Sequence, residues 1–231
     1  MKTQQFMYHT LIALIPGAMV MAYFFGPGIV INLAACIATG WLCETLVYRI
    51  NKTANGHPSD GSGLLTCALI GLALPPFLPI PIAMAGVVFA LVFGKHVYGG
   101  LGQNIFNPAM VGYAGLIIAF PMAMTQWQSS TPISYDLYPL ILIKTGLLEI
   151  QGFSGATPLD LFRHRQGQTV AEFWLTQGTR MSAFAWINIA FLVGGLYLIK
   201  VKVISWHMPA ATLIGILAAS LVFYDSGSSA S

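Results

Sequence analysis

Long apolar runs with almost no charge fill most of this 231-residue chain, and they limit what it can fold into. Charged residues make up 7 % of the sequence, whereas a soluble domain carries about 25 % because its surface faces water. Ten basic and seven acidic side chains are too few to cover a soluble domain of this length. The composition excludes a soluble enzyme, a nucleic-acid-binding protein and a disordered chain. It predicts an all-α, polytopic membrane helix bundle that contacts the lipid bilayer.

Five of the runs are near the length of about 20 residues that a helix needs to cross a bilayer. They are residues 6–25, 29–47, 105–125, 183–199 and 203–224. Two shorter runs, 64–74 and 82–94, lie on either side of Pro75 and Pro76. Short apolar segments interrupted by proline are typical of broken helices that line a site at membrane depth, and two short tilted spans are the alternative. We therefore expect six or seven transmembrane helices, some of them short or broken.

The distribution of charge predicts the domain organisation and the orientation. Residues 1–125 are expected to form a first helix repeat, 126–182 an external loop, 183–224 the start of a second repeat and 225–231 a polar tail. With a cytoplasmic N-terminus, alternating spans place six basic residues on the inner face, as the positive-inside rule requires. These residues are Lys2, Arg49, Lys52, Lys95, Lys200 and Lys202. Within the loop, residues 139–150 are too few to span and are expected along the interface or on the bundle.

Polar residues inside the predicted spans are candidates for a role beyond packing. An acid within a span is a functional candidate, but Glu44 is close to Arg49 and is expected at least as readily to extend to the cytoplasmic interface. The three cysteines Cys36, Cys43 and Cys67 are too few for an iron–sulfur cluster and are expected to pack. The five histidines are dispersed without metal-ligand spacing, so no metal site is predicted.

A motif of small residues lies in the predicted external loop. It consists of Ser154, Gly155, Ala156 and Thr157. Thr157 is a good N-cap, Pro158 suits the first helical position and Asp160 occupies the third, so the motif predicts the start of a short surface helix. A helix N-terminus preceded by small residues also binds phosphate, because its backbone N–H groups point outward. The two interpretations are compatible, since a phosphate on Thr157 would accept from the same N–H groups.

The motif, continued by Pro158 and Leu159, resembles the flavinylation motif of a family that includes the RnfD protein of the Rnf electron-transport complex and a related membrane protein of the sodium-translocating NADH:quinone reductase. Three further stretches are similar to that family in the same order. They are DGSGLLT at 60–66, LPP at 74–76 and YGGLGQNIFNPAMVG at 98–112. The family usually has an aspartate six residues before its modified threonine, where this sequence has Gln151. Family members also continue through further helices in two related halves, so the resemblance implies a chain truncated at its C-terminus.

The resemblance implies two flavins. FMN would be held on Thr157 through a phosphoester, within the motif of small residues. In the relatives a pair of asparagines lies near a second, non-covalent flavin, riboflavin, and the matching residues here are Asn104 and Asn107. The plain interpretation of the same pair is a turn and a helix cap before Pro108, since asparagine favours both. Both interpretations stay open at the level of the sequence.

The resemblance also implies a function and partners. The chain would pass electrons inward from an external flavin-carrying subunit, in a complex that couples ferredoxin/NAD electron transfer to sodium or proton movement. Further expected partners are membrane iron–sulfur subunits and a flavin transferase that acts on the outer face of a bacterial inner membrane. Such a chain is an electron carrier rather than a stand-alone enzyme. The alternatives are a solute channel or carrier, favoured by the broken helices near Pro75, and a non-redox assembly subunit.

Overall fold

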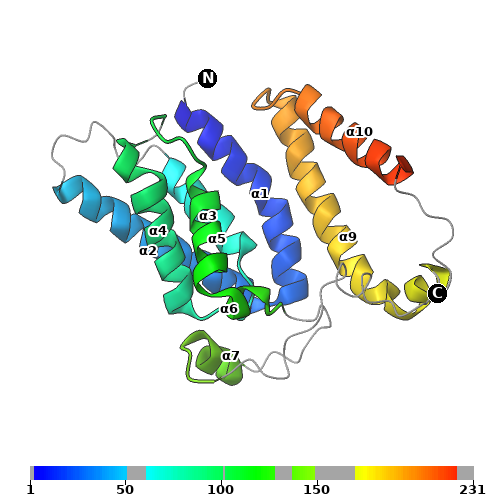
Figure 1. The fold of residues 1–231 in the computed structure, drawn as a ribbon, viewed down its shortest axis with the longest axis horizontal. Helices are drawn as coiled ribbons and strands as arrows, with labels where there is room; N and C mark the ends of the chain where they lie inside the picture. The colour runs from blue at the N-terminus through cyan, green and yellow to red at the C-terminus, as the bar shows by residue number, and fades with distance from the viewer. Residues whose placement is uncertain (1–2, 51–60, 101, 128–136, 149–169, 223–231) are drawn as a thin grey trace.

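The computed structural model describes residues 3–50, 61–100, 102–127, 137–148 and 170–222, and every regular element in these parts is a helix. Four helical segments are long and apolar enough to cross a bilayer, and three shorter apolar helices accompany them. The four segments are Thr3–Phe25, Pro27–Ile50, Ile80–Tyr98 and Ala183–Lys200. The predicted all-α, polytopic membrane architecture is therefore confirmed. Figure 1 shows the long helices side by side, with the N-terminus at one end of the bundle.

The first two helices correspond to the first two apolar runs. α1 covers Thr3–Phe25 and α2 covers Pro27–Ile50. Gly26 between them has a φ of 72°, a left-handed conformation that glycine adopts without steric cost and that ends helices. The missing N–H of Pro27 is tolerated in the first helical turn, so α2 starts at once and returns through the bundle. α2 then packs against both of the next two helices.

Proline explains the break between α3 (Ser62–Ala73) and α4 (Ile80–Gly94). The amide of Leu74 donates to Ile70 O at 3.1 Å, and the two prolines that follow have no N–H with which to continue α3. A turn closes the break, since the Leu78 amide donates to Pro75 O at 3.0 Å. α4 continues into the short helix η1 (His96–Tyr98), and together they form a candidate span of 19 residues. The run 82–94 is thus part of a longer span than the sequence predicted.

The run 105–125 was expected to be a single span, and the structure divides it. α5 covers only Pro108–Ala119, and α6 covers Pro121–Thr125. Phe120 between them has φ −133° and ψ 55°, outside the helical region, because Pro121 disfavours a helical residue before it. The prediction of one long helix here is wrong. It relied on apolar composition, which does not reveal that a single proline interrupts the helix.

The largest apolar core lies among α2, α3, α4 and α5. Cys36 and Cys67 are fully buried in it, and Cys43 is partly buried against it. The prediction that the cysteines pack is confirmed. Among the described residues, no group of three or more His, Cys, Asp or Glu side chains lies close enough to hold a metal ion.

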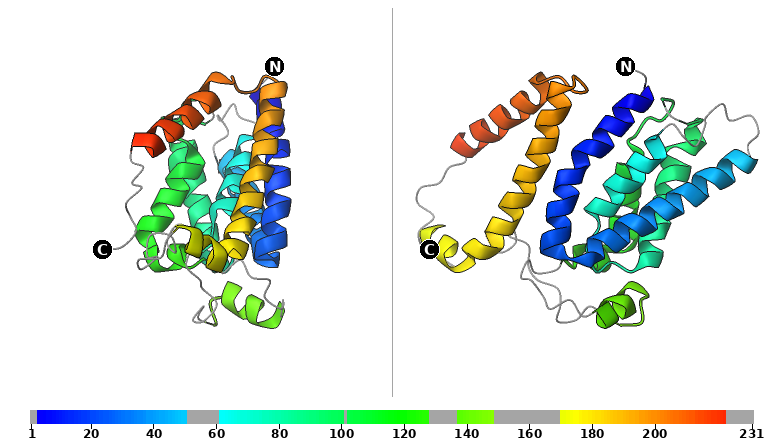
Figure 2. Two further views of the ribbon diagram at one scale, coloured as in Figure 1. Left: turned by 90° about the vertical axis from the view of Figure 1, so that its right-hand side faces the viewer. Right: turned by 180° about the vertical axis from the view of Figure 1, so that it is seen from behind.

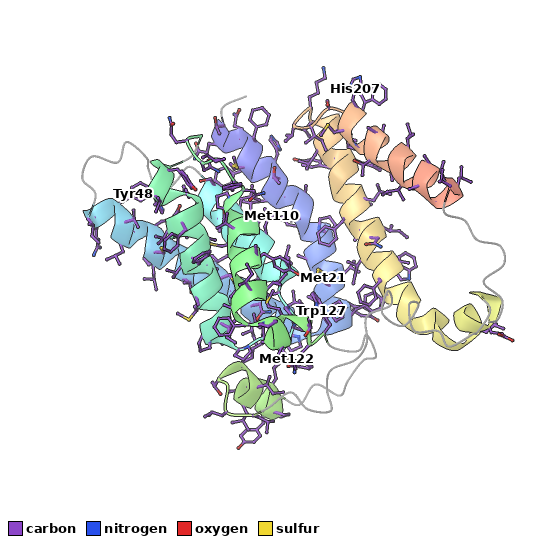
Figure 3. The ribbon with its side chains drawn as sticks, in the orientation of Figure 1. Met21, Tyr48, Met110, Met122, Trp127 and His207 are labelled. Atoms are coloured by element: carbon purple, nitrogen blue, oxygen red, sulfur yellow. The ribbon has the colours of Figure 1, made fainter. Side chains whose placement is uncertain are left out.

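A second core joins the beginning and the end of the chain. α9 (Val170–Lys200) lies along α1, and Gly194 allows close contact, because a Cβ at this position would lie 2.0 Å from Ala13 O. Met21 and Trp127 belong to this core, and Figure 3 shows both at the lower end of α1. α9 begins 13 residues before the apolar run 183–199, so it includes the last part of the segment that was expected as a loop.

The last described helix, α10, covers His207–Val222. The sequence predicted a span from 203 to 224, but residues 201–204 form turns and α10 has 16 residues. From Thr212 onward every described side chain of α10 is exposed. The exposed side chains are mostly apolar, such as Leu213, Ile214 and Leu217, as expected of a helix in a bilayer.

A short helix, α7 (Leu137–Lys144), crosses the end of the bundle opposite the N-terminus, as Figures 1 and 2 show. Leu140 and Ile143 pack against Phe77 at the break between α3 and α4. This placement confirms, for the described residues 139–148, the expectation that the stretch packs on the bundle instead of spanning the membrane.

Candidate functional site

The residues of the predicted flavinylation motif lie outside the described residues. They are Ser154, Gly155, Ala156 and Thr157, and Gln151 lies outside as well. The structure describes the two elements that flank them, α7 on one side and the start of α9 on the other. Both elements lie at the end of the bundle opposite the N-terminus (Figure 2).

Lys144 fixes the last residue of α7 to the membrane bundle. Its ammonium donates to Asn32 Oδ1 on α2 and, at 3.1 Å, to the carbonyl of Leu78 in the break. The amide of Asn32 in turn donates from Nδ2 to Pro75 O at 2.9 Å. Lys144 and Asn32 are 2 % and 0 % exposed. This polar network therefore satisfies backbone carbonyls that the prolines leave without intrahelical partners.

The burial of Lys144 changes its protonation. Lys144 lies in α7, outside the candidate spans. Desolvation lowers its pKa from 10.5 to about 7, and the nearby Cys36 thiol opposes this shift. A lysine that donates to neutral oxygen atoms therefore exchanges its proton near neutral pH, 13 positions before Thr157 in the sequence.

Asn104 and Asn107 form the predicted turn and cap. Asn107 Oδ1 accepts from the amide of Ala109 at 3.0 Å and caps α5. Asn104 Oδ1 accepts from the amide of Gly102 at 3.2 Å, and its Nδ2 donates to Phe106 O at 2.8 Å. The turn-and-cap interpretation is therefore confirmed, and the flavin interpretation stays a prediction.

The same two asparagines line a pocket of about 280 Å³ at the N-terminal end of the bundle. Its other polar groups come from Ser62 and Thr66 on α3 and from Lys95. The volume is just below the range of small-molecule pockets, about 300–1,000 Å³. The amide, hydroxyl and ammonium groups suit the polar edge of a planar heterocycle. The residues present therefore fit part of a flavin ring better than a whole flavin with its side chain.

Glu44 and Lys95 form a buried ion pair, which corrects two expectations. Lys95 Nζ donates to Glu44 Oε1 at 2.6 Å, and the side chains are 2 % and 6 % exposed for Lys95 and Glu44. Glu44 thus points into the bundle and does not extend to the interface. Lys95 was counted among the charges of a short inner loop, but its side chain is buried inside the protein, where it contacts Glu44. Glu44 and Lys95 are 51 positions apart, so the sequence alone does not indicate that they form a pair.

Sequence reasoning missed Lys144 and Asn32. Both carried a signal, because each is a polar residue within an apolar stretch, and such residues are rare unless they face the protein interior. What the sequence did not reveal is that α7 folds back under the bundle and brings Lys144 to the α3–α4 break. Another tertiary contact between distant residues links His9 Nδ1 and Tyr197 Oη at 2.8 Å and ties α1 to α9.

Comparison with known proteins identifies the family of this chain. The sequence profile of the NQR2, RnfD, RnfE family matches residues 1–231. A protein of Cellvibrio japonicus, named as the D-type subunit of the ion-translocating oxidoreductase complex, is 38 % identical over 100 % of this chain and 68 % of that protein. Proteins of the same name from Alcanivorax borkumensis and Pseudomonas aeruginosa are 42 % and 37 % identical, over 93 % and 99 % of this chain and 65 % and 68 % of their own length.

The chain thus spans about two thirds of the length of these relatives. The profile match covers every residue, and the relatives exceed 35 % identity across almost the whole chain. This chain belongs to the NQR2, RnfD, RnfE family.

Proposed function

We propose that this chain is a membrane subunit of an ion-translocating electron-transport complex of the ferredoxin/NAD oxidoreductase type, and that it carries FMN covalently on Thr157. The observation that carries the proposal is the motif Ser154 to Thr157 in a chain that matches the family over residues 1–231. Relatives named as subunits of an ion-translocating oxidoreductase complex support the role in a multisubunit assembly.

The position of the motif in the chain supports this assignment. α7 and the start of α9 flank the motif and lie at the end of the bundle opposite the N-terminus. With the N-terminus in the cytoplasm of a bacterium, the motif lies on the external face of the inner membrane. A flavin transferase and an external flavin-carrying subunit act or bind on that face.

The protein and the flavin have separate tasks in this proposal. The isoalloxazine ring supplies the electron-transfer chemistry when FMN is attached. Thr157 supplies the hydroxyl oxygen of the phosphoester, and the residues before it in the sequence, Gly155 and Ala156, are small. The proposal requires Asp160 to point away from the phosphate, since like charges repel. Electrons then pass inward through the bundle to membrane iron–sulfur subunits, so the chain is an electron carrier within a translocase.

A second, non-covalent flavin is proposed near Asn104 and Asn107. The pocket that they line offers two amides, two hydroxyl groups and the Lys95 ammonium within about 280 Å³. These groups match the donors and acceptors along the edge of riboflavin. If the Asn107→Ala variant of the purified protein keeps its full content of non-covalent flavin, this assignment is wrong.

Intact mass of the purified chain tests the covalent site. The chain is co-expressed with its flavin transferase, beside a Thr157→Ala control. The expected result is a mass increase equal to FMN minus water, present in the parent chain and lost in the control. An unmodified mass in a folded, co-expressed chain overturns the FMN assignment and favours a solute carrier or a non-redox assembly subunit. Neither of these alternatives predicts a flavin that survives denaturing electrophoresis.

A further inference from the structure

Two pockets lie on opposite faces of α3. The larger, about 520 Å³, is lined by Leu64 and Cys67 of α3, and the smaller, about 280 Å³, by Leu65 and Leu69. With 3.6 residues per turn, residues three or four positions apart share a face, so these two pairs point to different sides of the helix. α3 is therefore the wall between the two pockets.

The buried ion pair connects these pockets. Glu44 lines the larger pocket and Lys95 lines the smaller one, while Lys95 Nζ lies 2.6 Å from Glu44 Oε1. The contact passes α3 at Gly63, where a Cβ would lie 2.2 Å from Glu44 Oε1. The glycine thus leaves the space through which the carboxylate reaches the ammonium. One hydrogen bond joins two pockets that α3 otherwise separates.

The helix ends around the pair stabilise its ionic form. Glu44 lies beside the first turn of α3, where free N–H groups favour a negative charge. Lys95 is the C-cap of α4, where free carbonyls favour a positive charge. A neutral form of the same pair avoids the cost of burying two charges. The pair therefore has two forms that both suit the site, one ionic and one neutral.

The pockets differ in the groups around the pair. The smaller pocket is polar, with Ser62, Thr66 and two asparagines on its wall, so it suits water beside Lys95. The larger pocket is mainly apolar, and Glu44 is its acidic group. Other titratable side chains near the pair come from each neighbouring element. They are Tyr8 on α1, Cys43 and Tyr48 on α2, Cys67 on α3 and His96 on η1.

We propose that Glu44 and Lys95 are a proton-exchange pair that passes protons across α3 between the two pockets. Moving one proton along the contact breaks an N–H bond of Lys95 and forms an O–H bond on Glu44, and it leaves a neutral amine and a neutral acid. Water in the larger pocket then takes the proton from Glu44, and water in the smaller pocket gives one to Lys95. The ionic pair is restored, one proton has crossed α3, and no electron has moved.

The role of the pair in ion translocation rests on the proposed function, but the proton exchange itself does not require a flavin. Infrared spectroscopy of the complex in ordinary and in heavy water therefore tests the exchange directly. The expected result is a carbonyl band of a protonated carboxylic acid in the parent complex, which moves to lower frequency in heavy water and is missing in Glu44→Gln. Lys95→Met should show a stronger band at neutral pH, because burial without an ammonium partner favours the protonated carboxyl. Parent spectra indistinguishable from those of Glu44→Gln overturn the proposal.

Either single variant leaves one partner of the pair alone and can fail to fold. The double variant Glu44→Gln/Lys95→Met removes both charges and keeps the volume, a change that buried ion pairs often tolerate. Thr39→Val is a matched control, since Thr39 is also a buried polar residue of α2 and, among the described residues, its hydroxyl bonds within its own helix, to Ala35 O at 2.8 Å.

Proton uptake during turnover of the complex in vesicles then measures the role of the pair. We expect the double variant to take up protons at least about tenfold more slowly, since a positioned proton-transfer group contributes on the order of 10²–10⁴. The control should match the parent. Unchanged uptake in a folded double variant overturns the role in translocation. Loss of the FMN mass, measured on the same samples, reports separately on the covalent flavin site.

Discussion

The structure buries two lysines at opposite ends of α4, and they are held in different ways. Lys95 caps the C-terminal end of α4 and pairs with Glu44 at 2.6 Å. Lys144 enters from α7 near the N-terminal end, about 22 Å away along a helix of this length, and donates to the neutral oxygen atoms of Asn32 and Leu78. Both are 2 % exposed, so their burial is the same and only their partners differ.

This difference teaches what a buried cation needs. A carboxylate and a helix C-terminus compensate the charge of Lys95, so burial does not leave that charge without a partner. Neutral acceptors satisfy the hydrogen bonds of Lys144 but not its charge, and desolvation lowers its pKa to about 7. The first lysine is held as half of an ion pair. The second is a hydrogen-bonded anchor that keeps its contacts even when the amine is neutral.

The largest effect is expected when the ion pair loses one partner. Lys95→Met leaves the Glu44 carboxyl buried without its ammonium, so that it either stays charged without a partner or must take up a proton, and we expect a loss of about 3–5 kcal/mol in unfolding free energy at neutral pH. Denaturant unfolding in detergent measures it. Combining the change with Glu44→Gln should recover most of the loss, because no uncompensated charge remains. If the double variant is as unstable as the sum of the single variants, the two residues do not act as a pair.

A smaller effect is expected from filling the space beside the pair. In Gly63→Ala the new Cβ would lie 2.2 Å from the Glu44 carboxylate, which Lys95 holds in place. We expect overpacking to cost about 1–3 kcal/mol. Gly195→Ala is the matched control, because a Cβ at this helical glycine meets nothing within 4 Å. Equal unfolding midpoints for both variants would contradict a tight contact at Gly63.

The second lysine of the comparison, Lys144, is tested by the pH dependence of the stability with which α7 packs on the bundle. We call α7 closed when it is packed on the bundle and open when it has detached and Lys144 is in water. Between about pH 7 and 10.5, Lys144 is neutral in the closed form and protonated in the open form. The open form then binds more protons, so the closed form gains stability as pH rises, by up to about 1.4 kcal/mol per pH unit. Hydrogen exchange of α7 amides, corrected for the intrinsic rate at each pH, measures this slope.

Below about pH 7 the slope should vanish, because Lys144 is protonated in both forms. Lys144→Met should show no slope at any pH, and it serves as the control for other titrating groups. A flat profile in the parent chain would mean that Lys144 keeps its charge while α7 is packed on the bundle.

The smallest effect is expected at the pocket wall next to Lys95. Asn107→Ala removes the side-chain cap of α5 and should destabilise the start of this helix by about 1 kcal/mol. Hydrogen exchange at the first turn of α5 measures the change. Asn107→Asp is the control, since an aspartate caps equally well. An equal loss of protection in both variants would show that the side-chain cap at position 107 does not stabilise the start of α5.

The sequence predicted the fold class and most helices, because apolar length and low charge restrict a chain to helices that cross or lie on a bilayer. It placed the helices Thr3–Phe25 and Pro27–Ile50 well. It missed the division at Phe120, because one proline changes the backbone without changing the apolar composition. For the candidate sites, it identified the cap at Asn107 from local chemistry, and Thr157 stays a prediction.

The tertiary structure alone decided the partners of the buried charges. Glu44 and Arg49 are close in sequence, yet the partner of Glu44 is Lys95, 51 positions away. Lys144 and Asn32 are 112 positions apart and meet only because α7 folds under the break between α3 and α4. Helix formation and membrane insertion depend on local composition, which a sequence displays directly. The pairing of buried polar groups depends on which helix faces come together, and that is fixed by packing across the whole bundle.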